Sequence, residues 1–301
     1  MSLPSESRRP FPLPLVAASP LPVDDGLEYL SMPQGMDTYC PPSLPDDLSG
    51  HDEAHALLSQ LLIELRVAAV DPLADIRRLS LRGLPPPERA LLDQLLGEGE
   101  VSARLLPDAE GRSAEVQEAV FAGVWRVVEH DANGLRADYL EVGAVPQLLR
   151  ETALADAPAA RDLVSEDAVL LDAGAAIQNA RPLLVELQDH AAAHRPGAAA
   201  QVVNLSLLPL TPQDIAYLDH RLGTGRVLIL SRGYGNCRIT DTCTPHTWRV
   251  VYYNSADTVI LNCVEVSDFP DVACAAAEDL ADSAQRLAEV LEWLEPARAE
   301  G

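Results

Sequence analysis

The chain contains an internal repeat. Residues 79–101 align with residues 205–227 at a constant offset, and twelve of the 23 positions are identical. The sequence Trp-Arg-Val-Val then occurs at 125–128 and at 248–251, and Pro146 has its counterpart in Pro270. The spacing between matches changes by only a few residues, as expected when insertions fall in surface loops. The sequence therefore predicts a tandem duplication of one structural unit.

Each unit is predicted to contain a helix, a strand, a second helix and a three-strand meander. Leucines at helical spacing mark the first helix, at Leu57, Leu58, Leu61, Leu62 and Leu65. A second apolar stripe, with spacings of four and three residues, predicts a C-terminal helix that docks on the body. It consists of Leu280, Ala284, Leu287, Leu291 and Leu294.

These elements predict an α+β fold in which helices pack on antiparallel or mixed sheets. We expect the two units to pack face to face with pseudo-twofold symmetry. The predicted boundaries are a proline-rich extended arm at 1–50, a first repeat at 51–150, a helical connector at 151–174, and a second repeat with the C-terminal helix at 175–301.

The most distinctive part of the second unit is residues 226–266. β-Branched and aromatic residues predict strands at 227–231, 247–253 and 258–266. In the first unit, strands are expected at 100–106, 116–128 and 136–142. The connection from Ser231 to His246 contains a Gly-Tyr-Gly-Asn-Cys turn that the first unit lacks. We therefore expect this loop to act as a recognition surface more than as a reaction site.

Charge limits the classes of partner. Lysine and arginine number 22 against 46 aspartates and glutamates, which gives a net charge of −24. Such a charge argues against non-specific binding to nucleic acids or anionic membranes and favours a soluble protein. On charge alone, an acidic solvated surface is a better explanation than a basic partner. No apolar run is long enough to predict a membrane span. Prolines interrupt the segment after Arg8-Arg9, so it lacks the apolar core of a signal peptide.

The cysteines suggest two hypotheses about chemistry. Five are present, with no Cys-x-x-Cys pair, which favours free thiols in a cytoplasmic protein. Cys237, Cys243 and His246 lie close together in the sequence and form a candidate metal site, although their spacing matches no familiar ligand pattern. Cys237 is also a candidate nucleophile, with His246 and Asn236 as nominal partners. The alternative to both the metal site and the nucleophile is that these residues have only structural roles, in the core or in a loop.

Other motifs favour structural roles. His51/His55 and His190/His194 are spaced for one helix face, but each pair lacks a third ligand nearby, so we expect solvated helix residues. Gly233 and Gly235 are followed by no Lys-Ser or Lys-Thr, so a turn explains them better than a phosphate loop. The absence of a strong catalytic signature favours a binding protein over an enzyme, and no cofactor is predicted.

Three segments carry a resemblance to a known family. They are LSRGYGNCRITDT at 230–242, the strand pair at 248–266 with its N-S-x-D-T turn, and P-x-V-A-x-A-x-x-E-D-L at 270–280, which runs into the C-terminal helix. With S-M-P-Q-G-M at 31–36, these segments resemble the hydrogenase expression/formation proteins called HupH, HyaF or HoxQ. The resemblance extends from about residue 31 to 294 and is strongest from 205 onward.

The resemblance implies an accessory factor in the maturation of uptake [NiFe] hydrogenases. Proteins of this family are thought to act on the iron–sulfur small subunit before twin-arginine export, beside a thioredoxin-like partner of the HyaE/HupG type. We therefore expect a non-enzymatic chaperone for the small-subunit precursor. The alternative is a metal or iron–sulfur-handling factor that uses the Cys237/Cys243/His246 loop. The candidate partner-binding residues are Met32, Met36, Arg232, Tyr234, Asn236 and Cys237.

Overall fold

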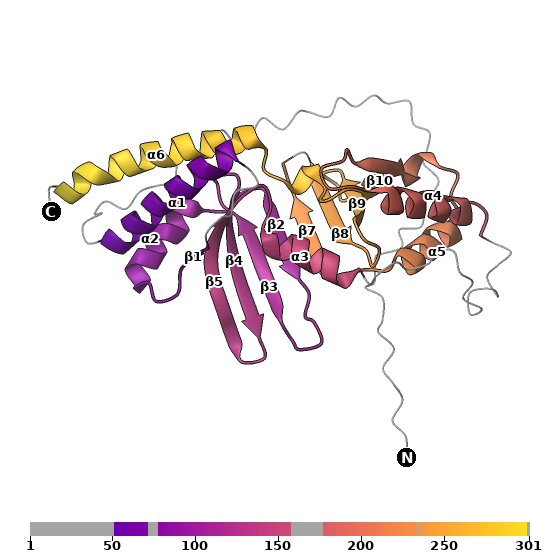
Figure 1. Ribbon diagram of the computed structural model, residues 1–301, viewed down its shortest axis with the longest axis horizontal. Coiled ribbons are helices and arrows are strands. Elements are labelled where there is room, and N and C mark those ends of the chain that lie inside the picture. Colours follow the sequence, from indigo (N-terminus) through magenta and orange to yellow (C-terminus); the bar gives the residue numbers. More distant parts are fainter. Residues whose placement is uncertain (1–50, 72–77, 158–176, 234, 300–301) are drawn as a thin grey trace, which may run out of the picture. The chain divides into compact units, whose positions relative to one another are not determined.

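A computed structural model describes residues 51–71, 78–157, 177–233 and 235–299 (Figure 1). The predicted arm at 1–50, with Met32 and Met36, lies outside these residues, as do Tyr234 and most of the predicted connector. The described strands form one ten-stranded sheet with the order β1-β5-β4-β3-β2-β7-β8-β9-β10-β6, and every pair is antiparallel. This architecture confirms the α+β class.

The elements follow one order in both halves. The first half consists of α1 (Asp52–Val70), β1 (Leu79–Ser80), α2 (Pro86–Leu96), β2 (Val101–Leu105), β3 (Ser113–Glu118), β4 (Val124–Asp131), β5 (Gly134–Val142) and α3 (Gln147–Asp156). The second consists of α4 (Ala180–Ala193), β6 (Gln201–Asn204), η2 (Leu205–Leu207), α5 (Pro212–Leu222), β7 (Val227–Ser231), β8 (Asn236–Asp241), β9 (Thr247–Tyr253), β10 (Val259–Val266), η3 (Asp271–Ala273) and α6 (Ala277–Ala299).

The two halves meet edge to edge, so the predicted face-to-face packing is wrong. β2 pairs with β7 over five residues, from Val101 opposite Ser231 to Leu105 opposite Val227. The sheet order is symmetric about this pair. Each half-sheet would otherwise end in a strand with unpaired backbone groups, and the β2–β7 ladder satisfies them. The duplication itself stays a hypothesis about the origin of this symmetry.

Each meander has four strands and not three. β8 lies inside the segment that was expected to be a loop, and β3 is its counterpart in the first half. Cys237, Ile239 and Asp241 of β8 point inward, whereas Arg238 and Thr240 between them are less buried. Burial that alternates with a period of two is typical of a strand. The sequence did not predict this strand because the segment is rich in Thr and Asp and lacks an alternating apolar pattern. The single strand expected at 116–128 is likewise divided into β3 and β4.

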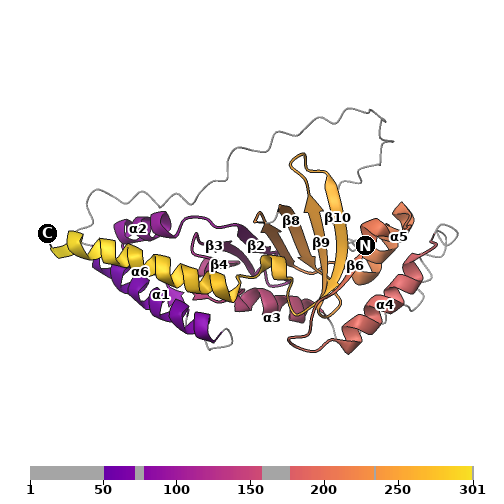
Figure 2. The same cartoon turned by 90° about the horizontal axis from the view of Figure 1, so that it is seen from above.

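The C-terminal helix packs on the first half. Figures 1 and 2 show α6 lying along α1, and Leu287 and Leu291 of α6 share one apolar core with Leu58 and Leu61 of α1. The predicted docking of the Leu280–Leu294 stripe on the body is therefore confirmed. In the second half, α4 and α5 enclose a smaller core against β10 around Leu187, Leu218 and Val264.

The central core lies on the sheet face that α3 and η3 cover, and two tryptophans anchor it. The indole Nε1 of Trp125 donates to the carbonyl of Gly143 at 2.8 Å, and that of Trp248 donates to the carbonyl of Ser267 at 3.3 Å. These equivalent hydrogen bonds fix the chain just after β5 and after β10. In the described part of the chain, no helix combines the length and apolar character needed to cross a membrane.

Candidate functional site

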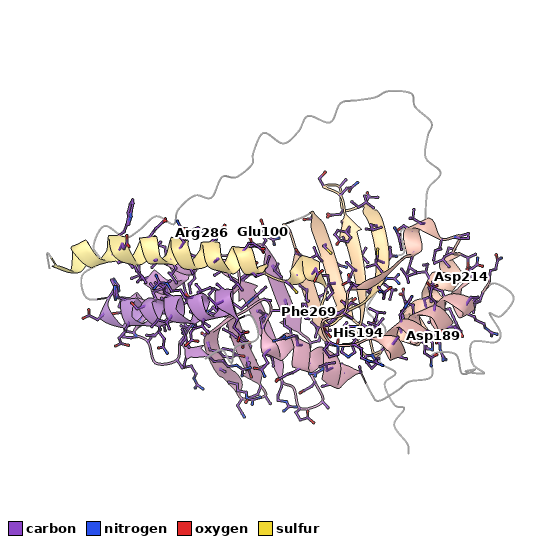
Figure 3. The ribbon with its side chains drawn as sticks, turned by 45° about the horizontal axis from the view of Figure 1, so that its top comes forward. Glu100, Asp189, His194, Asp214, Phe269 and Arg286 are labelled. Atoms are coloured by element: carbon purple, nitrogen blue, oxygen red, sulfur yellow. The ribbon has the colours of Figure 1, made fainter. Side chains whose placement is uncertain are left out.

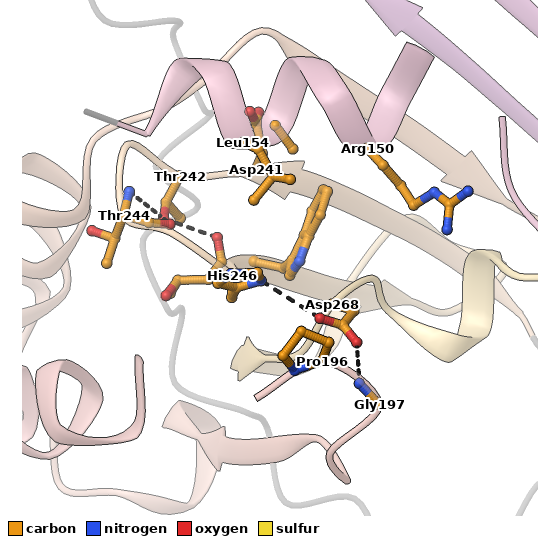
Figure 4. Close-up of a pocket in the computed structure, with 12 residues that line it drawn as sticks. Arg150, Leu154, Pro196, Gly197, Asp241, Thr242, Thr244, His246 and Asp268 are labelled. Carbon is orange, nitrogen blue, oxygen red and sulfur yellow. Dashed lines mark hydrogen bonds and ion pairs between the residues drawn. The ribbon is translucent and has the colours of Figure 1, made fainter. Parts of the chain in front are cut away.

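A cavity of about 470 Å³ opens where the turn after β8 faces α3 (Figure 4). Arg150 and Leu154 of α3 line one side, and His246 and Asp268 line the other. Pro196 and Gly197, which follow α4, complete the wall. The cavity therefore combines an apolar side with titratable groups, which is the usual composition of a small-molecule or ion site.

Two of the lining residues, His246 and Asp268, contact a third titratable side chain, that of His194. The Nε2 atom of His194 lies 2.8 Å from Oδ1 of Asp268, and Nδ1 of His246 lies 3.7 Å from the same oxygen. The two imidazole ring centroids are 4.4 Å apart. Within the described ranges, these residues form the one group of three or more His, Cys, Asp or Glu side chains whose ligand atoms all lie within 4.8 Å of one another.

Three separate segments bring these side chains together. His194 is the residue at which α4 ends, and Figure 3 marks its position. His246 closes the turn between β8 and β9 with a φ of 55°, a left-handed conformation that is uncommon outside glycine. Asp268 follows β10, and its Oδ2 accepts the amide N–H of Gly197 at 2.6 Å.

Burial and charge set the protonation of this group. Burial lowers the pKa of His246, and the neighbouring His194 lowers it further, against the opposing effect of Asp268. Burial alone raises the pKa of Asp268, but the hydrogen bonds from Gly197 and His194 outweigh it, so this pKa is lowered. Asp268 is therefore a carboxylate at neutral pH. The Nδ1 atom of His246 is buried and has no hydrogen-bond partner.

A buried acid beside the cavity supports the junction of the two halves. The Oδ1 atom of Asp241 accepts the amide N–H of Val227, the first residue of β7, at 2.9 Å. Glu118 has the same role in the first half, where it accepts the amides of Val101 and Gly123. Burial raises the pKa of Asp241 to about 7 and also raises that of Glu118.

The cysteine-based metal hypothesis finds no support in the geometry. Cys237 lies in the central core at 2% exposure, and burial raises its pKa to about 12. Cys243 lies in the turn beyond the other end of β8. Six residues of nearly extended chain span about 20 Å, so the two thiols cannot share an ion. Of the three predicted ligands, only His246 belongs to the cluster described above.

The cluster includes a residue that the sequence led us to set aside. His194 was expected to be solvated, but its side chain is only 4% exposed and contacts Asp268. The expectation failed because the two side chains that lie next to His194, those of His246 and Asp268, are 52 and 74 residues away in the chain. Nothing in the local sequence distinguishes His194 or Asp268, and only the path of the chain around β8, β9 and β10 brings them together.

Three of the partner-binding candidates, Arg232, Asn236 and Cys237, are described by the structure and lie at the opposite end of β8. Arg232 and Asn236 are exposed beside the hairpin that joins β7 to β8, whereas Cys237 is buried. Arg232 borders a wide groove of about 770 Å³ over β2, β3 and β7, on the sheet face opposite the central core. Leu228 and Leu230 of β7 contribute to its lining, and Leu230 is 40% exposed.

The groove also carries charge. Acidic side chains line it at Asp93, Glu98 and Glu115. Two of its arginines are paired: Arg126 contacts Asp93 at 2.8 Å, and Arg104 lies 3.8 Å from Glu115. The groove thus combines apolar side chains with three carboxylates and three arginines, one of which is the exposed Arg232.

Comparison with known proteins adds to this geometry. The sequence model of the family described as "HupH hydrogenase expression protein, C-terminal conserved region" matches residues 52–166 and 177–294. The matched ranges correspond to the two halves of the sheet. The chain belongs to the HupH hydrogenase expression protein family.

Curated relatives of this family extend over most of the chain. The hydrogenase expression/formation protein HoxQ of Cupriavidus necator is 47% identical, over 94% of this chain and 98% of its own. HupH of Rhodobacter capsulatus is 43% identical, over 89% and 92%. The hydrogenase-1 operon protein HyaF of Escherichia coli is 35% identical, over 79% and 80%.

A solved structure of the same family is also similar in part. It is the hydrogenase expression protein HupH from Thiobacillus denitrificans, with 32% sequence identity and a TM-score of 0.35 over 39% of this chain and 96% of that chain. The curated relatives and the family model support a role in hydrogenase maturation. Their names describe proteins of hydrogenase expression and formation.

Proposed function

We propose that this HupH-family protein is a cytoplasmic accessory factor that binds the precursor of the hydrogenase small subunit before its export. The groove over β2, β3 and β7 is the observation that carries the proposal. An exported precursor has a signal segment with basic residues followed by an apolar stretch. Such a segment needs an exposed apolar surface and nearby carboxylates, and the groove has both.

Strand β7 contributes two of the apolar side chains of the groove. Because side chains alternate along a strand, Leu228 and Leu230 lie on the same face, while Val227 and Ile229 enter the central core. Leu230 is thus held in position by a rigid central strand, although it is 40% exposed. A fixed apolar side chain loses little conformational freedom when a client covers it.

The groove itself has as many arginines as carboxylates, so the attraction for a basic segment comes from the charge of the whole chain. The whole chain has a net charge of −24, which attracts cationic partners over distances of about a Debye length. Of the three carboxylates that line the groove, Asp93 and Glu115 form ion pairs with arginines and, within the described part of the chain, Glu98 does not. Glu98 is therefore the carboxylate that a basic client segment would contact. Binding should therefore weaken as the salt concentration rises.

The test compares two forms of the client. Purified small-subunit precursor and the processed mature subunit are each titrated onto the immobilised full-length protein at low and high salt. We expect the precursor to bind and the mature subunit to bind at least about tenfold more weakly. Equal binding of both forms contradicts the role of the signal segment.

A pair of variants locates the binding surface. Leu230→Asp introduces a charge into the groove and is expected to weaken precursor binding by about tenfold or more. Leu207→Asp is the matched control, because Leu207 is 80% exposed on η2, outside the groove. If both variants bind the precursor like the unmodified protein, the groove is not the client surface.

A further inference from the structure

We propose that His194, His246 and Asp268 bind a divalent first-row transition-metal ion. The proposal is independent of the client-binding function, because it concerns the cavity at α3 and not the groove on the other sheet face. It rests on the spacing of the three donors, on the unpartnered nitrogen of His246, and on a comparison between the two halves of the molecule.

The donor atoms are spaced for one ion. A tetrahedral zinc site with bonds of about 2.0–2.1 Å places its ligand atoms roughly 3.3 Å apart. The two measured separations from Oδ1 of Asp268, 2.8 Å to His194 and 3.7 Å to His246, lie on either side of this value. The ligand atoms of the three side chains all lie within 4.8 Å of one another, so side-chain shifts of up to about 1.5 Å bring them around one metal.

The surroundings of His246 and Asp268 fit a bound metal ion better than a simple ion pair between the side chains. The Nδ1 atom of His246 is buried without a hydrogen-bond partner, which is costly unless something else satisfies it. The amide of Gly197 holds the second oxygen of Asp268, as second-shell hydrogen bonds do in metal sites. The adjoining cavity leaves room for a water molecule or another ligand at a fourth position.

The first half shows that the fold does not require these donors. The turn that contains His246 corresponds to the turn that contains Gly123, because Ser267 and Gly143 donate equivalent hydrogen bonds to their carbonyls. Asp268 and Ala144 are the next residues along. The first half therefore has glycine and alanine where the second half has two of the three donors.

The donor types define the class of ion. Two imidazoles and one carboxylate suit zinc and its first-row neighbours, whereas magnesium and calcium prefer sites made of oxygen. Three protein ligands with an open fourth position are typical of a site that exchanges a ligand. We therefore use Zn²⁺ and Co²⁺ as probes.

The experiment uses the full chain after treatment with a chelator. Zn²⁺ affinity is measured by competition with a chromophoric chelator, and Co²⁺ is followed by its visible absorption. We expect one equivalent of metal to bind. His246→Gly and Asp268→Ala, which copy the residues of the first half, should each weaken Zn²⁺ binding by at least about tenfold. Circular dichroism and thermal unfolding confirm that both variants fold.

The matched control is His190→Ala. His190 lies one turn before His194 on α4, and its Nε2 atom is 3.7 Å from Oε1 of Glu186. Its substitution should leave the affinity unchanged. The proposal is overturned by a lack of saturable binding, by equal affinity in His246→Gly and Asp268→Ala, or by an equal loss in His190→Ala. A thiolate-to-Co²⁺ charge-transfer band would place the ion at a cysteine and would also overturn it.

Discussion

Gly123 and His246 occupy the same turn in the two halves of the sheet. The carbonyl of Gly123 accepts the amide of Gly143, and the carbonyl of His246 accepts the amide of Ser267, each at 2.9 Å. Both residues have positive φ, 80° and 55°. In the first half α6 covers the turn, whereas in the second half a cavity lies beside it. One backbone turn therefore supports two different surfaces.

This relationship predicts that substitutions at the two positions change the free energy of unfolding by different amounts. His246→Gly removes a left-handed non-glycine residue but increases the freedom of the unfolded chain, so we expect the free energy of unfolding to change by less than about 1 kcal/mol. Gly123→Ala should destabilise by about 2 kcal/mol or more, because an added Cβ meets the side chain of Leu280 at a positive φ. Urea unfolding measures both. A loss in His246→Gly as large as that in Gly123→Ala contradicts the equivalence of the turns.

Asp241 should make stability depend on pH. Its folded pKa of about 7 exceeds its ordinary value of 3.8, so the folded state holds the proton more tightly. The resulting stabilisation is complete below pH 3.8 and is lost as the pH rises through about 7. It amounts to at most about 4 kcal/mol. Asp241→Asn stays neutral, so its stability relative to the unmodified protein should increase between pH 4 and 8.

Urea unfolding at several pH values measures this difference. Asp282→Asn, at an exposed position on α6, controls for the general loss of one negative charge. A difference between Asp241→Asn and the unmodified protein that stays constant from pH 4 to 8 shows that Asp241 is ionised throughout this range.

The docking of α6 on α1 predicts a large effect of one leucine. Leu287 is fully buried in the core shared with Leu58 and Leu61. Leu287→Ala should lower the free energy of unfolding by about 3 kcal/mol, through lost burial and the cavity that remains. Trp293→Ala on the same helix should change it by less than about 0.5 kcal/mol, because Trp293 is 73% exposed. Similar effects in thermal or urea unfolding contradict this packing.

Burial also predicts the reactivity of the thiols. The thiolate is the reactive form, and the pKa of Cys237 is raised to about 12 within the central core. Iodoacetamide at pH 8 should therefore label Cys237 slowly in the folded protein and rapidly in urea, as followed by peptide mass spectrometry. Cys243, which is only partly buried, should react sooner. Rapid labelling of Cys237 in the folded protein would contradict this prediction and would support the hypothesis that Cys237 is a nucleophile.

Much of the fold could be predicted from local patterns. The leucine stripes at 57–65 and 280–294 correspond to α1 and α6, since helical spacing records one buried face. The apolar strands β7 and β9 were also correctly expected. β8 was missed because half of its residues face solvent and are polar, and its buried Asp241 interrupts the apolar pattern. The candidate site was reached only through His246, since its other two donors lack a local signal.

The sequence by itself determined the two leucine-striped helices, the apolar strands β7 and β9, the acidic charge and the resemblance to hydrogenase expression proteins. Each of these features can be predicted from residues that are close together in the chain, from matched segments or from composition. Only the tertiary structure decided that β2 and β7 join the halves edge to edge, that α6 crosses to α1, and that His194 and Asp268 meet His246. These are contacts between distant segments, and they depend on which strand edges and apolar faces satisfy one another.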